Sequence, residues 1–576
     1  MAKRSHKVVD EVSLALKRLR KGTAARKLES PTLDFKAPSP SPRATFTVVA
    51  EAVVCFANAT GGTVVLGVYD DNRWPDALVG IDLPAETLRR AVYERTSPAL
   101  DVTVEPMVFE GVTLLKVTVP EGLEVYGTST GRYCWRRGTD CHPMTADDVG
   151  RLREERRGDD WSGRSARAGG VDVVDATAVA RARELLARVP SGGVAALAQG
   201  SAGDLVEGLG LLTPAGALTH AGWLLFARRA EAEPASIVYQ YRRVSGGEPD
   251  TVLHLEGPLL PAVERLLEAV ELRLVQTPVN LAGGQQVAVQ DFPVAAVREA
   301  LVNAVVHGDH RTGRPVHVEH SPEWLTVTSP GPLVAGVTPE NILRHPSRAR
   351  FRLLFSAFRH LGLVEQVGAG VDRMYREMLR FGRNPPRISE DRDQVSVTFV
   401  ADEPNIRIAR FVNALPAADR DDLDVLLVLS LLRRRRSVSA PAAATEIQRP
   451  VADAQALLRR MSEGEAALLE PTAGSTHRRQ PNYRLRGPVL AQLGSAVAYH
   501  RAPAIERDRK IVEHLAEYGS INNHTVQNLF DVDVYRASAV LRDLVDREVV
   551  VRTSEQTRGQ AVRYGCGPAF RQSRHG

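Results

Sequence analysis

Three polar side chains recur at a fixed spacing in the otherwise apolar stretch REALVNAVVHGDH, residues 298–310. Glu299, Asn303 and His307 lie four residues apart, so in a helix they stand one above another on a single face. Burying such groups unpaired costs roughly 1–3 kcal/mol each. The stripe therefore predicts a helix whose polar face meets water, a partner or a ligand.

Two glycines downstream indicate which chemistry this face could serve. Gly368 and Gly370 stand just before another predicted helix, in VEQVGAGVDRMYREM. Such glycines let backbone amides and a helix N-terminus approach phosphate. Together with SPGPL from Ser329, ARFRLLFSAFRHLGLVE from Ala349 and the earlier LTHAGWLLFA, these segments resemble the GHKL-type ATP-binding domain that follows AlbA_2 domains in many bacterial proteins.

The resemblance implies a Bergerat-type α/β sandwich that binds ATP with Mg²⁺. Asn303 would coordinate the magnesium ion, because a neutral carbonyl oxygen is a suitable hard ligand. Glu299 would orient or deprotonate an attacking water, and Gly368 and Gly370 would cradle phosphate. The other residues that the resemblance places at the nucleotide are His307, Gly331 and Arg350.

The chain departs from this family pattern at several positions. The family's Arg-Asn-Pro stretch reads Arg-Phe-Arg at residues 350–352, and Gly308 and His310 stand where arginine and tyrosine are usual. No adenine-recognising Asp is visible before SPGPL. These departures leave base specificity and hydrolysis without support from the sequence.

A purely structural role for the polar stripe is the alternative. Asn303 and His307 would then bond to the backbone, and Glu299 would pair with Arg298 or Arg350. Both interpretations predict the same helix and differ only in what occupies its polar face.

Acidic residues near the N-terminus form a second candidate site. Glu29 and Asp34 lie in ESPTLDFK, and Asp70 and Asp71 end FANATGGTVVLGVYDD. Clustered carboxylates can hold a divalent cation that activates water and neutralises a scissile phosphate. These segments, with GRYCWRRGTD at 131–140, resemble the Schlafen AlbA_2 family. The resemblance implies nucleic-acid contact and, in some relatives, metal-dependent RNA cleavage by three acids, here Glu29, Asp34 and either Asp70 or Asp71, with Asp34 in place of the usual Glu.

Nucleic-acid binding without cleavage is the other interpretation of this region, with the acids as ordinary strand-edge and turn charges. Basic side chains that flank Tyr133 and Trp135 would combine phosphate contact with base stacking. The residues expected to make these contacts are Lys36, Arg132, Arg136 and Arg137. The alternation in RYCWRR equally fits an ordinary strand with one wet face.

The last 70 residues read as helix, turn, helix, turn, helix and a hairpin of two strands. This order looks like a winged helix-turn-helix, whose third helix enters the major groove while the wing touches the DNA backbone. The residues expected to face nucleic acid are Tyr535, Arg536, Ser538, Arg542, Arg552, Arg558 and Arg563. The preceding segment, residues 423–492, has a similar order and is a candidate for a second, shorter winged helix.

Length and composition predict an α/β and α+β protein of several domains. The 576 residues are 43% hydrophobic with a net charge of only +5, so any nucleic-acid affinity must come from local patches. The predicted divisions are an N-terminal helix at 1–28, an AlbA_2-like domain at 29–152, a linker at 153–170, a GHKL-like region at 171–400, a linker at 401–422, and the winged helices at 423–492 and 505–570.

Cysteine usage and hydropathy indicate the compartment. Cys55, Cys134, Cys141 and Cys566 are scattered, with no pair at zinc-knuckle spacing, so we expect reduced thiols in the cytoplasm. A metal between Cys134, Cys141 and His142 lacks a fourth ligand nearby, which favours ordinary strand and loop residues. No segment approaches the roughly 18 apolar residues of a membrane span.

Taken together, these features predict a cytoplasmic DNA-binding transcriptional regulator that responds to ATP and acts as a homo-oligomer, with RNA as a second candidate partner. The alternative is a Schlafen-like metal-dependent nuclease acting on RNA or single-stranded nucleic acid, in a defence role. Whether the chain is an enzyme is open at this stage, either as a nuclease or as a weak ATPase.

Overall fold

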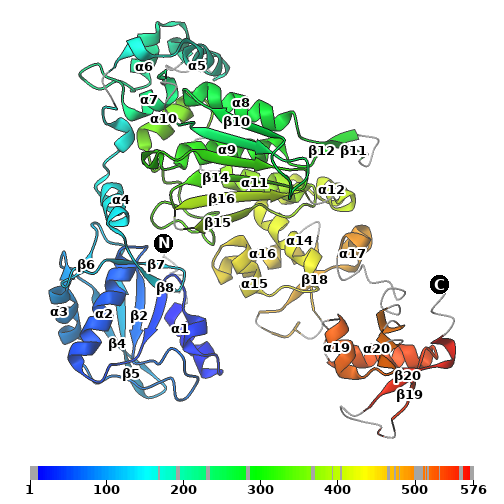
Figure 1. Ribbon diagram of the computed structural model, residues 1–576. Coiled ribbons are helices and arrows are strands. Elements are labelled where there is room, and N and C mark those ends of the chain that lie inside the picture. The colour runs from blue at the N-terminus through cyan, green and yellow to red at the C-terminus, as the bar shows by residue number, and fades with distance from the viewer. Residues whose placement is uncertain are drawn as a thin grey trace, which may run out of the picture. The chain divides into compact units, whose positions relative to one another are not determined.

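The computed structural model describes residues 11–570, with gaps at 167–168, 190–194, 229–233, 281–285, 365–369, 392, 402–404, 464–466, 473–474, 479, 498–509, 513, 516–517, 531, 533, 555 and 557–561. The chain divides into two compact units (Figure 1). The first comprises residues 1–274, 294–374 and 386–401, and the second comprises residues 275–293, 375–385 and 402–576. Each unit is described by itself.

The N-terminal lobe of the first unit is built on a four-stranded sheet in the order β1-β2-β5-β4. Its strands are β1 (Leu33–Lys36), β2 (Gly62–Leu66), β5 (Val112–Val119) and β4 (Thr103–Phe109). Helix α2 (Pro42–Ala57) connects β1 to β2, which run parallel as a helical crossover requires, whereas the other pairs are antiparallel. The strand predicted after the Gly-Gly turn is confirmed as β2.

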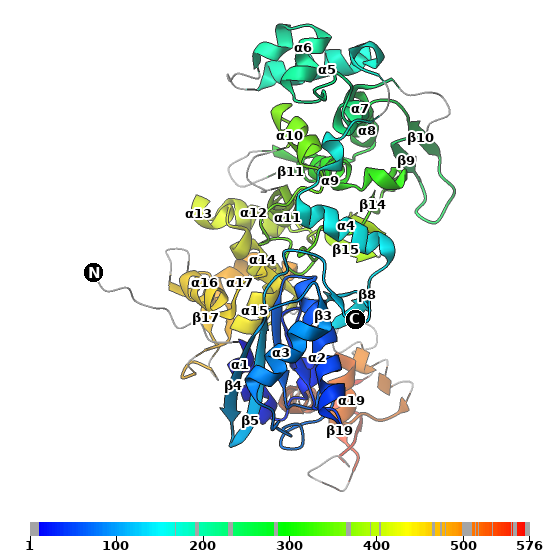
Figure 2. The ribbon, with the colours of Figure 1, turned by 90° about the vertical axis from the view of Figure 1, so that its left-hand side faces the viewer.

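Both faces of this sheet are covered by helices. The core on one face contains apolar residues of α2 and α3 (Ala85–Arg95), which lie next to each other in Figure 2. The core on the other face contains residues of α1 (Glu11–Arg20) and η1 (Ala25–Leu28). Burial on both faces accounts for the unbroken apolar run VVL in β2.

The rest of the lobe leads into the predicted linker. Strands β3 (Thr96–Ser97) and β6 (Gly127–Thr128) pair, and β7 (Cys134–Arg137) and β8 (Asp140–Pro143) form a hairpin against α2. Helix α4 (Ala146–Arg157) begins at a capping box between Thr145 and Asp148. The first five residues of the predicted linker at 153–170 are therefore helical.

The second lobe of the first unit contains a mixed six-stranded sheet in the order β10-β9-β13-β14-β16-β15. Only β9 and β13 are parallel. The strands are β9 (Ile237–Tyr241), β10 (Thr251–Leu255), β13 (Val316–His320), β14 (Trp324–Pro330), β15 (Arg387–Asp391) and β16 (Gln394–Val400). The multidomain α/β prediction is thus confirmed at the level of mixed sheets and helices.

Helices surround this sheet, and α9 (Val294–His307) packs on β14. Its apolar residues, from Ala296 to Val306, are buried, as the predicted amphipathic helix requires. The other helices are α5 (Ala176–Arg188), α6 (Ala202–Gly208), α7 (His220–Phe226), α8 (Leu259–Glu271), α10 (Arg352–His360) and α11 (Gly370–Arg380), whose last residues belong to the second unit. Short 3-10 turns are η2 (Trp161–Gly163), η3 (Val171–Val173), η4 (Ala195–Gln199) and η5 (His310–Thr312).

The second unit begins with the hairpin of β11 (Gln276–Asn280) and β12 (Gln286–Gln290). Helices α12 (Ile406–Asn413) and α13 (Ala417–Arg420) occupy much of the segment predicted as a linker at 401–422. A first module follows, with α14 (Leu423–Arg434), α15 (Ala440–Ile447), α16 (Val451–Glu463), β17 (Leu469–Pro471) and β18 (Tyr483–Leu485). Helix α17 (Gly487–Leu493) and η6 (Gly494–Ala496) end it.

A second module repeats this order. Helical residues between 510 and 518 precede α19 (Asn523–Phe530), α20 (Val534–Asp546), β19 (Val550–Arg552) and β20 (Tyr564–Cys566). In both modules the residue two positions before the second helix forms a β-bridge with a tyrosine of the last strand, Val438 with Tyr483 and Ile521 with Tyr564. The two C-terminal segments, drawn in yellow and in orange to red in Figure 1, thus share one order of helices and strands.

Cysteine pairing differs from the prediction. Cys55 and Cys141 form a disulfide whose Cα atoms are 5.9 Å apart, while Cys134 and Cys566 are free. The expectation of four reduced thiols is therefore wrong for Cys55 and Cys141. Within the described part of the chain, no helix has both the length and the apolar character needed to cross a membrane.

Candidate functional site

The polar stripe of α9 opens onto a pocket in the second lobe with a volume of about 170 Å³. Glu299, Asn303 and His307 all line it, on one side of the helix. Apolar side chains from three strands of the sheet form another wall of the pocket, namely Val327, Ile388, Val395 and Val397. The stripe therefore faces a largely apolar pocket with a few polar groups, an arrangement typical of small-molecule sites.

Gly370 brings the first turn of α11 against Glu299. A Cβ atom added at Gly370 would lie 1.9 Å from Glu299 Oε1, so no other residue fits without displacing that carboxylate. Glu299 Oε2 lies 3.5 Å from Nη1 of Arg373, which is on α11 like Gly370. The structural alternative had predicted a pair with Arg298 or Arg350 instead. Gly368 lies outside the described residues.

His307 is a neutral group at the end of the stripe. Burial, together with the nearby Arg350 guanidinium, lowers the pKa of its imidazole to about 4. The imidazole is therefore uncharged at neutral pH and offers one hydrogen-bond donor and one acceptor. It does not attract phosphate by charge.

Arg350 holds together three chain segments at the pocket. Its guanidinium, with a side chain only 2% exposed, lies 3.1 Å from Glu155 and 3.9 Å from Asp309. It also donates to the backbone carbonyls of His307 and Pro332. The predicted nucleotide contact of this arginine would have to replace bonds that it already makes inside the protein.

Glu155 lies in the segment that the sequence predicts as a linker, and no pattern there marks it as a pocket residue. Its second carboxylate oxygen accepts from the backbone N–H of Ala335, 3.3 Å away, in the loop that lines the pocket. The capping box at Thr145 and Asp148 was the signal that the helix runs through this position. Gly331, at φ +85°, does not line the pocket but packs so closely that an added Cβ would lie 2.6 Å from Asp309 Cβ.

The N-terminal acids are only partly brought together. Asp34, on β1 and 3% exposed, lies 2.8 Å from Lys36 Nζ and 3.6 Å from Arg136 Nη1. Glu29 accepts from the backbone N–H of Phe35, and burial, followed by the Asp34 charge, raises its pKa to about 7. The Glu29 and Asp34 carboxyl groups thus interact directly.

Asp70 does not complete a metal-binding triad. Its backbone carbonyl accepts from the N–H of Arg26, just before Glu29. Among the described residues, Glu29, Asp34 and Asp70 are not a group whose ligand atoms all lie within 4.8 Å of one another. The three carboxylates therefore do not converge on one point in the described structure.

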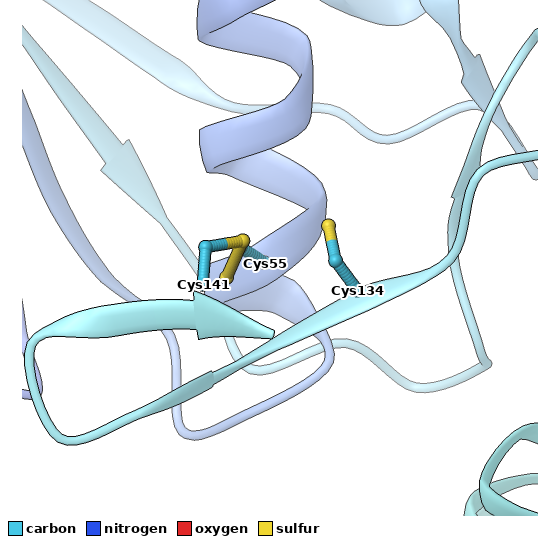
Figure 3. Close-up of side chains that lie close together, drawn as sticks. All are labelled: Cys55, Cys134 and Cys141. Carbon is cyan, nitrogen blue, oxygen red and sulfur yellow. A yellow bond between two sulfur atoms is a disulfide. The ribbon is translucent and has the colours of Figure 1, made fainter. Parts of the chain in front are cut away.

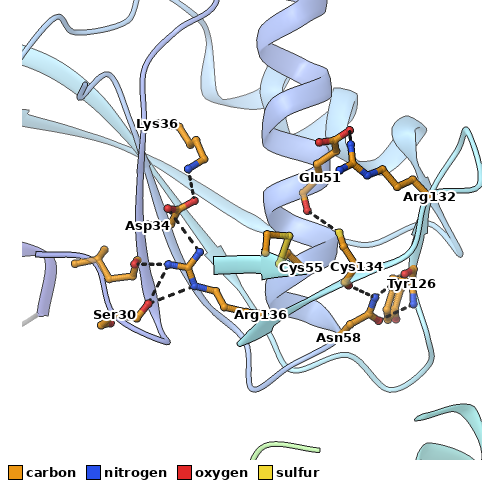
Figure 4. The surroundings of a disulfide bond; sticks show 12 residues. Ser30, Asp34, Lys36, Glu51, Cys55, Asn58, Tyr126, Arg132, Cys134 and Arg136 are labelled. Carbon is orange, nitrogen blue, oxygen red and sulfur yellow. Dashed lines mark hydrogen bonds and ion pairs between the residues drawn. A yellow bond between two sulfur atoms is a disulfide. The ribbon is translucent and has the colours of Figure 1, made fainter. Parts of the chain in front are cut away.

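Arg136 does not face solvent as predicted. Its guanidinium donates to the carbonyls of Ser30 (Figure 4) and Leu33. It also lies over the Phe56 ring, 4.5 Å from the ring centroid. With a side chain 4% exposed, it cannot contact nucleic acid in this structure. The other predicted contacts, Lys36, Arg132 and Arg137, have side chains that are 29%, 57% and 28% exposed and pair with Asp34, Glu51 and Glu390.

Helix α20 of the second C-terminal module carries exposed aromatic and basic side chains. Tyr535 is 84% exposed, and Arg536 and Arg542 are exposed on the same helix. Arg552 and Arg563 are exposed on or beside the hairpin strands, whereas Ser538 accepts from Asn523 Nδ2 at 2.7 Å. Arg558 lies outside the described residues.

Two family models match parts of this chain. Residues 29–145 match the model described as "Schlafen, AlbA_2", and residues 313–399 match HATPase_c_4, described as "Putative ATP-dependent DNA helicase recG C-terminal". The chain thus carries a Schlafen AlbA_2 domain followed by a RecG-related HATPase_c_4 segment. The second match includes Gly331, Arg350 and Gly370 but begins after helix α9.

Solved structures also resemble the chain. The DIP2311 protein from Corynebacterium diphtheriae is 25% identical with a TM-score of 0.51, over 84% of this chain and 98% of that one. The N-terminal domain of a RecG-related protein from Nitrosomonas europaea is 26% identical with a TM-score of 0.14, over 19% of this chain and 71% of that one. No curated protein matches the chain.

Proposed function

We propose that this chain is a DNA-binding transcriptional regulator whose second lobe binds a nucleotide. The observation that carries the proposal is the exposure of Tyr535, Arg536 and Arg542 on α20, in a module of three helical segments and a hairpin. This order is that of a winged helix-turn-helix, in which the third helix enters the major groove and the hairpin contacts the backbone. Two copies of the chain, bound to paired half-sites, would form the active homo-oligomer.

The two C-terminal modules differ in the surroundings of the arginines on their third helices. On α16 of the first module, Arg459 pairs with Glu463 and Arg460 pairs with Asp419 and Asp422. On α20, Arg542 is exposed and, seven residues from Tyr535, lies on the same side of the helix, and Arg536 is exposed as well. The second module is therefore better suited to contact DNA.

DNA binding is tested with the full-length chain and a library of genomic fragments, at several salt concentrations. Arg536→Ala and Arg542→Ala should each weaken binding about tenfold or more, and loss of a phosphate contact should reduce the salt slope by about one. Arg459→Ala, in the first module, is the matched control and should leave affinity unchanged. Equal affinity for all variants would contradict the assignment of α20.

ATP with Mg²⁺ is the proposed ligand of the second lobe. The pocket supplies a carboxylate from Glu299, an amide from Asn303, a neutral imidazole from His307 and an apolar wall for a base. Asn303 would hold the magnesium ion, which neutralises phosphate charge when bound. The match to the HATPase_c_4 family supports this proposal, and Gly370 would let the start of α11 approach phosphate.

Isothermal titration of the full-length chain with ATP and Mg²⁺ tests nucleotide binding. Asn303→Ala should abolish the magnesium-dependent part of the affinity, while binding without magnesium persists. Turnover, measured as phosphate release, distinguishes a binding protein from a weak ATPase and should depend on Glu299. No heat of binding with wild type would refute the proposed ligand.

Nucleic-acid cleavage is a second candidate function, favoured by one observation. Glu29 is a half-buried carboxyl group whose pKa is raised to about 7 beside Asp34, as in many catalytic sites. Incubation with manganese and transfer RNA tests it, and Glu29→Gln should abolish cleavage. Asp34→Ala alone is a poor test, because it also removes the partner of Lys36 and Arg136.

A further inference from the structure

Three cysteine side chains meet between helix α2 and the β7–β8 hairpin. Cys55 comes from α2, Cys134 from β7 and Cys141 from β8, and their Sγ atoms all lie within 4.8 Å of one another (Figure 3). Cys55 and Cys141 are bonded as a disulfide, and Cys134 is a free thiol beside it. No other group of three candidate metal-binding side chains among the described residues is so closely placed.

Backbone contacts keep Cys134 beside α2 independently of the disulfide. Asn58, at the end of α2, donates to the carbonyl of Cys134 at 2.8 Å and to that of Tyr126 at 2.7 Å. The Cys134 thiol itself donates to the carbonyl of Glu51, with 3.6 Å between the atoms, and Arg132 forms an ion pair with Glu51 (Figure 4). A free thiol is therefore held within reach of a disulfide.

The burial of the three sulfurs sets the direction of any exchange. Cys55 and Cys134 are 1% and 2% exposed, whereas Cys141 is exposed. Attack by Cys134 on the sulfur of Cys55 releases the sulfur of Cys141 at the surface. Attack on Cys141 would instead release a charged thiolate at the buried Cys55, which is costly.

We propose that Cys55, Cys134 and Cys141 form a thiol–disulfide exchange site whose product is a surface thiol at Cys141 that reacts with low-molecular-weight disulfides. In the first step the Cys134 thiolate forms a bond to Cys55, the Cys55–Cys141 bond breaks, and Cys141 leaves as a thiolate and takes up the proton that Cys134 lost. No net oxidation occurs in this step. In the second step the Cys141 thiolate attacks a low-molecular-weight disulfide, forming a mixed disulfide and releasing one thiolate of that reagent.

The exchange would change what holds the hairpin to α2. Before it, β8 is tied to the helix through Cys141, and after it, β7 is tied through Cys134. Strand β7 also carries Arg136, which binds the loop between Ser30 and Leu33. The bond to Cys134 would tie the strand that carries Arg136 to α2, while β8 becomes free to carry the modification.

The first step is expected to be slow at neutral pH. Burial raises the pKa of the Cys134 thiol to about 11, with a smaller opposing effect of Arg132, so little thiolate is present. Exchange should therefore be followed over hours rather than minutes. Oxidised glutathione serves as the low-molecular-weight disulfide.

Disulfide mapping by mass spectrometry tests the proposal on the full-length chain, with Cys566→Ser in every protein to remove the other exposed thiol. Incubation with oxidised glutathione should add one glutathione at Cys141 and produce a Cys55–Cys134 linkage. Cys141→Ser should form the Cys55–Cys134 disulfide under the same conditions. Cys134→Ser should keep only Cys55–Cys141 and add no glutathione, and its melting profile shows that it is folded.

Two results would overturn the proposal. One is a Cys141→Ser protein in which Cys55 and Cys134 both remain free thiols after oxidation. The other is a stoichiometric zinc ion that the reduced wild type retains through gel filtration and that each single Cys→Ser substitution releases. That result would assign the three sulfurs to a metal site instead.

Discussion

The Arg350 guanidinium lies 3.1 Å from the Glu155 carboxylate, across 195 residues of sequence. The pair connects helix α4, which follows the AlbA_2 domain, with the loop that lines the pocket of the second lobe. Glu155 also accepts a hydrogen bond from the backbone N–H of Ala335. One carboxylate therefore binds both the Arg350 guanidinium and this backbone amide at the edge of the pocket. An anionic ligand that used Arg350 would have to displace it.

Glu155→Gln should destabilise the first unit. Arg350 is 2% exposed, and removing one partner of a buried ion pair costs about 3–5 kcal/mol. Asp309, 3.9 Å away, still neutralises part of the charge, so we expect about 3 kcal/mol. Urea unfolding measures the loss, and Asp159→Asn, which affects an exposed pair with Arg164, is the matched control.

The same variant should strengthen anion binding at the pocket if Arg350 contacts phosphate. Removing the competing carboxylate leaves the guanidinium available to a ligand. Titration with ATP would then show a lower Kd for Glu155→Gln than for wild type. An unchanged Kd would restrict Arg350 to its structural role.

Gly370→Ala should block the pocket with little effect on the rest of the fold. The new Cβ would lie 1.9 Å from Glu299 Oε1, so the carboxylate or the start of α11 must move. We expect ATP affinity to fall at least tenfold, which is about 1.4 kcal/mol. In Gly150→Ala the added methyl group meets nothing within 4 Å, so this variant on α4 should bind like wild type.

Local sequence patterns predicted the helix at the pocket, but they did not predict which residues far apart in the sequence pair with each other. The four-residue spacing of Glu299, Asn303 and His307 is a property of one helix, so it can be read from neighbouring residues. The Glu155–Arg350 pair and the Cys55–Cys141 disulfide join positions 195 and 86 residues apart. No local pattern specifies such partners, because they depend on how whole elements pack.

Strand alternation separated two faces of RYCWRR without showing which one is buried. Cys134 and Arg136 share the inward face, while Trp135 and Arg137 lie on the other, as a period of two residues requires. Because both residues are basic, the sequence predicted that Arg136 and Arg137 are exposed to solvent. The packing of β7 against α2 decides the direction, and it turns Arg136 inward.

Arg136→Lys should loosen the loop that carries Glu29. The planar guanidinium of Arg136 donates to the backbone carbonyls of Ser30 and Leu33, and a lysine ammonium cannot reproduce that geometry. We expect a loss of about 1–3 kcal/mol, as for hydrogen bonds to a buried charged group. Thermal unfolding measures it, and Arg132→Lys, on an exposed pair, should lose less than about 1 kcal/mol.

His307 should make the free energy of unfolding decrease as the pH is lowered below 6.5. In the folded chain burial lowers the pKa of this imidazole to about 4, whereas the unfolded chain takes up a proton near 6.5. Between these values the unfolded state binds more protons, so the free energy of unfolding decreases as pH falls and levels off below about 4. The full effect is on the order of 3 kcal/mol. The glutamine in His307→Gln cannot titrate. The difference in the free energy of unfolding between this variant and wild type, measured from pH 4 to 7, therefore isolates the contribution of His307. Other titrating groups, such as His320, are common to both proteins. A difference that is constant with pH would show that His307 is protonated equally in both states.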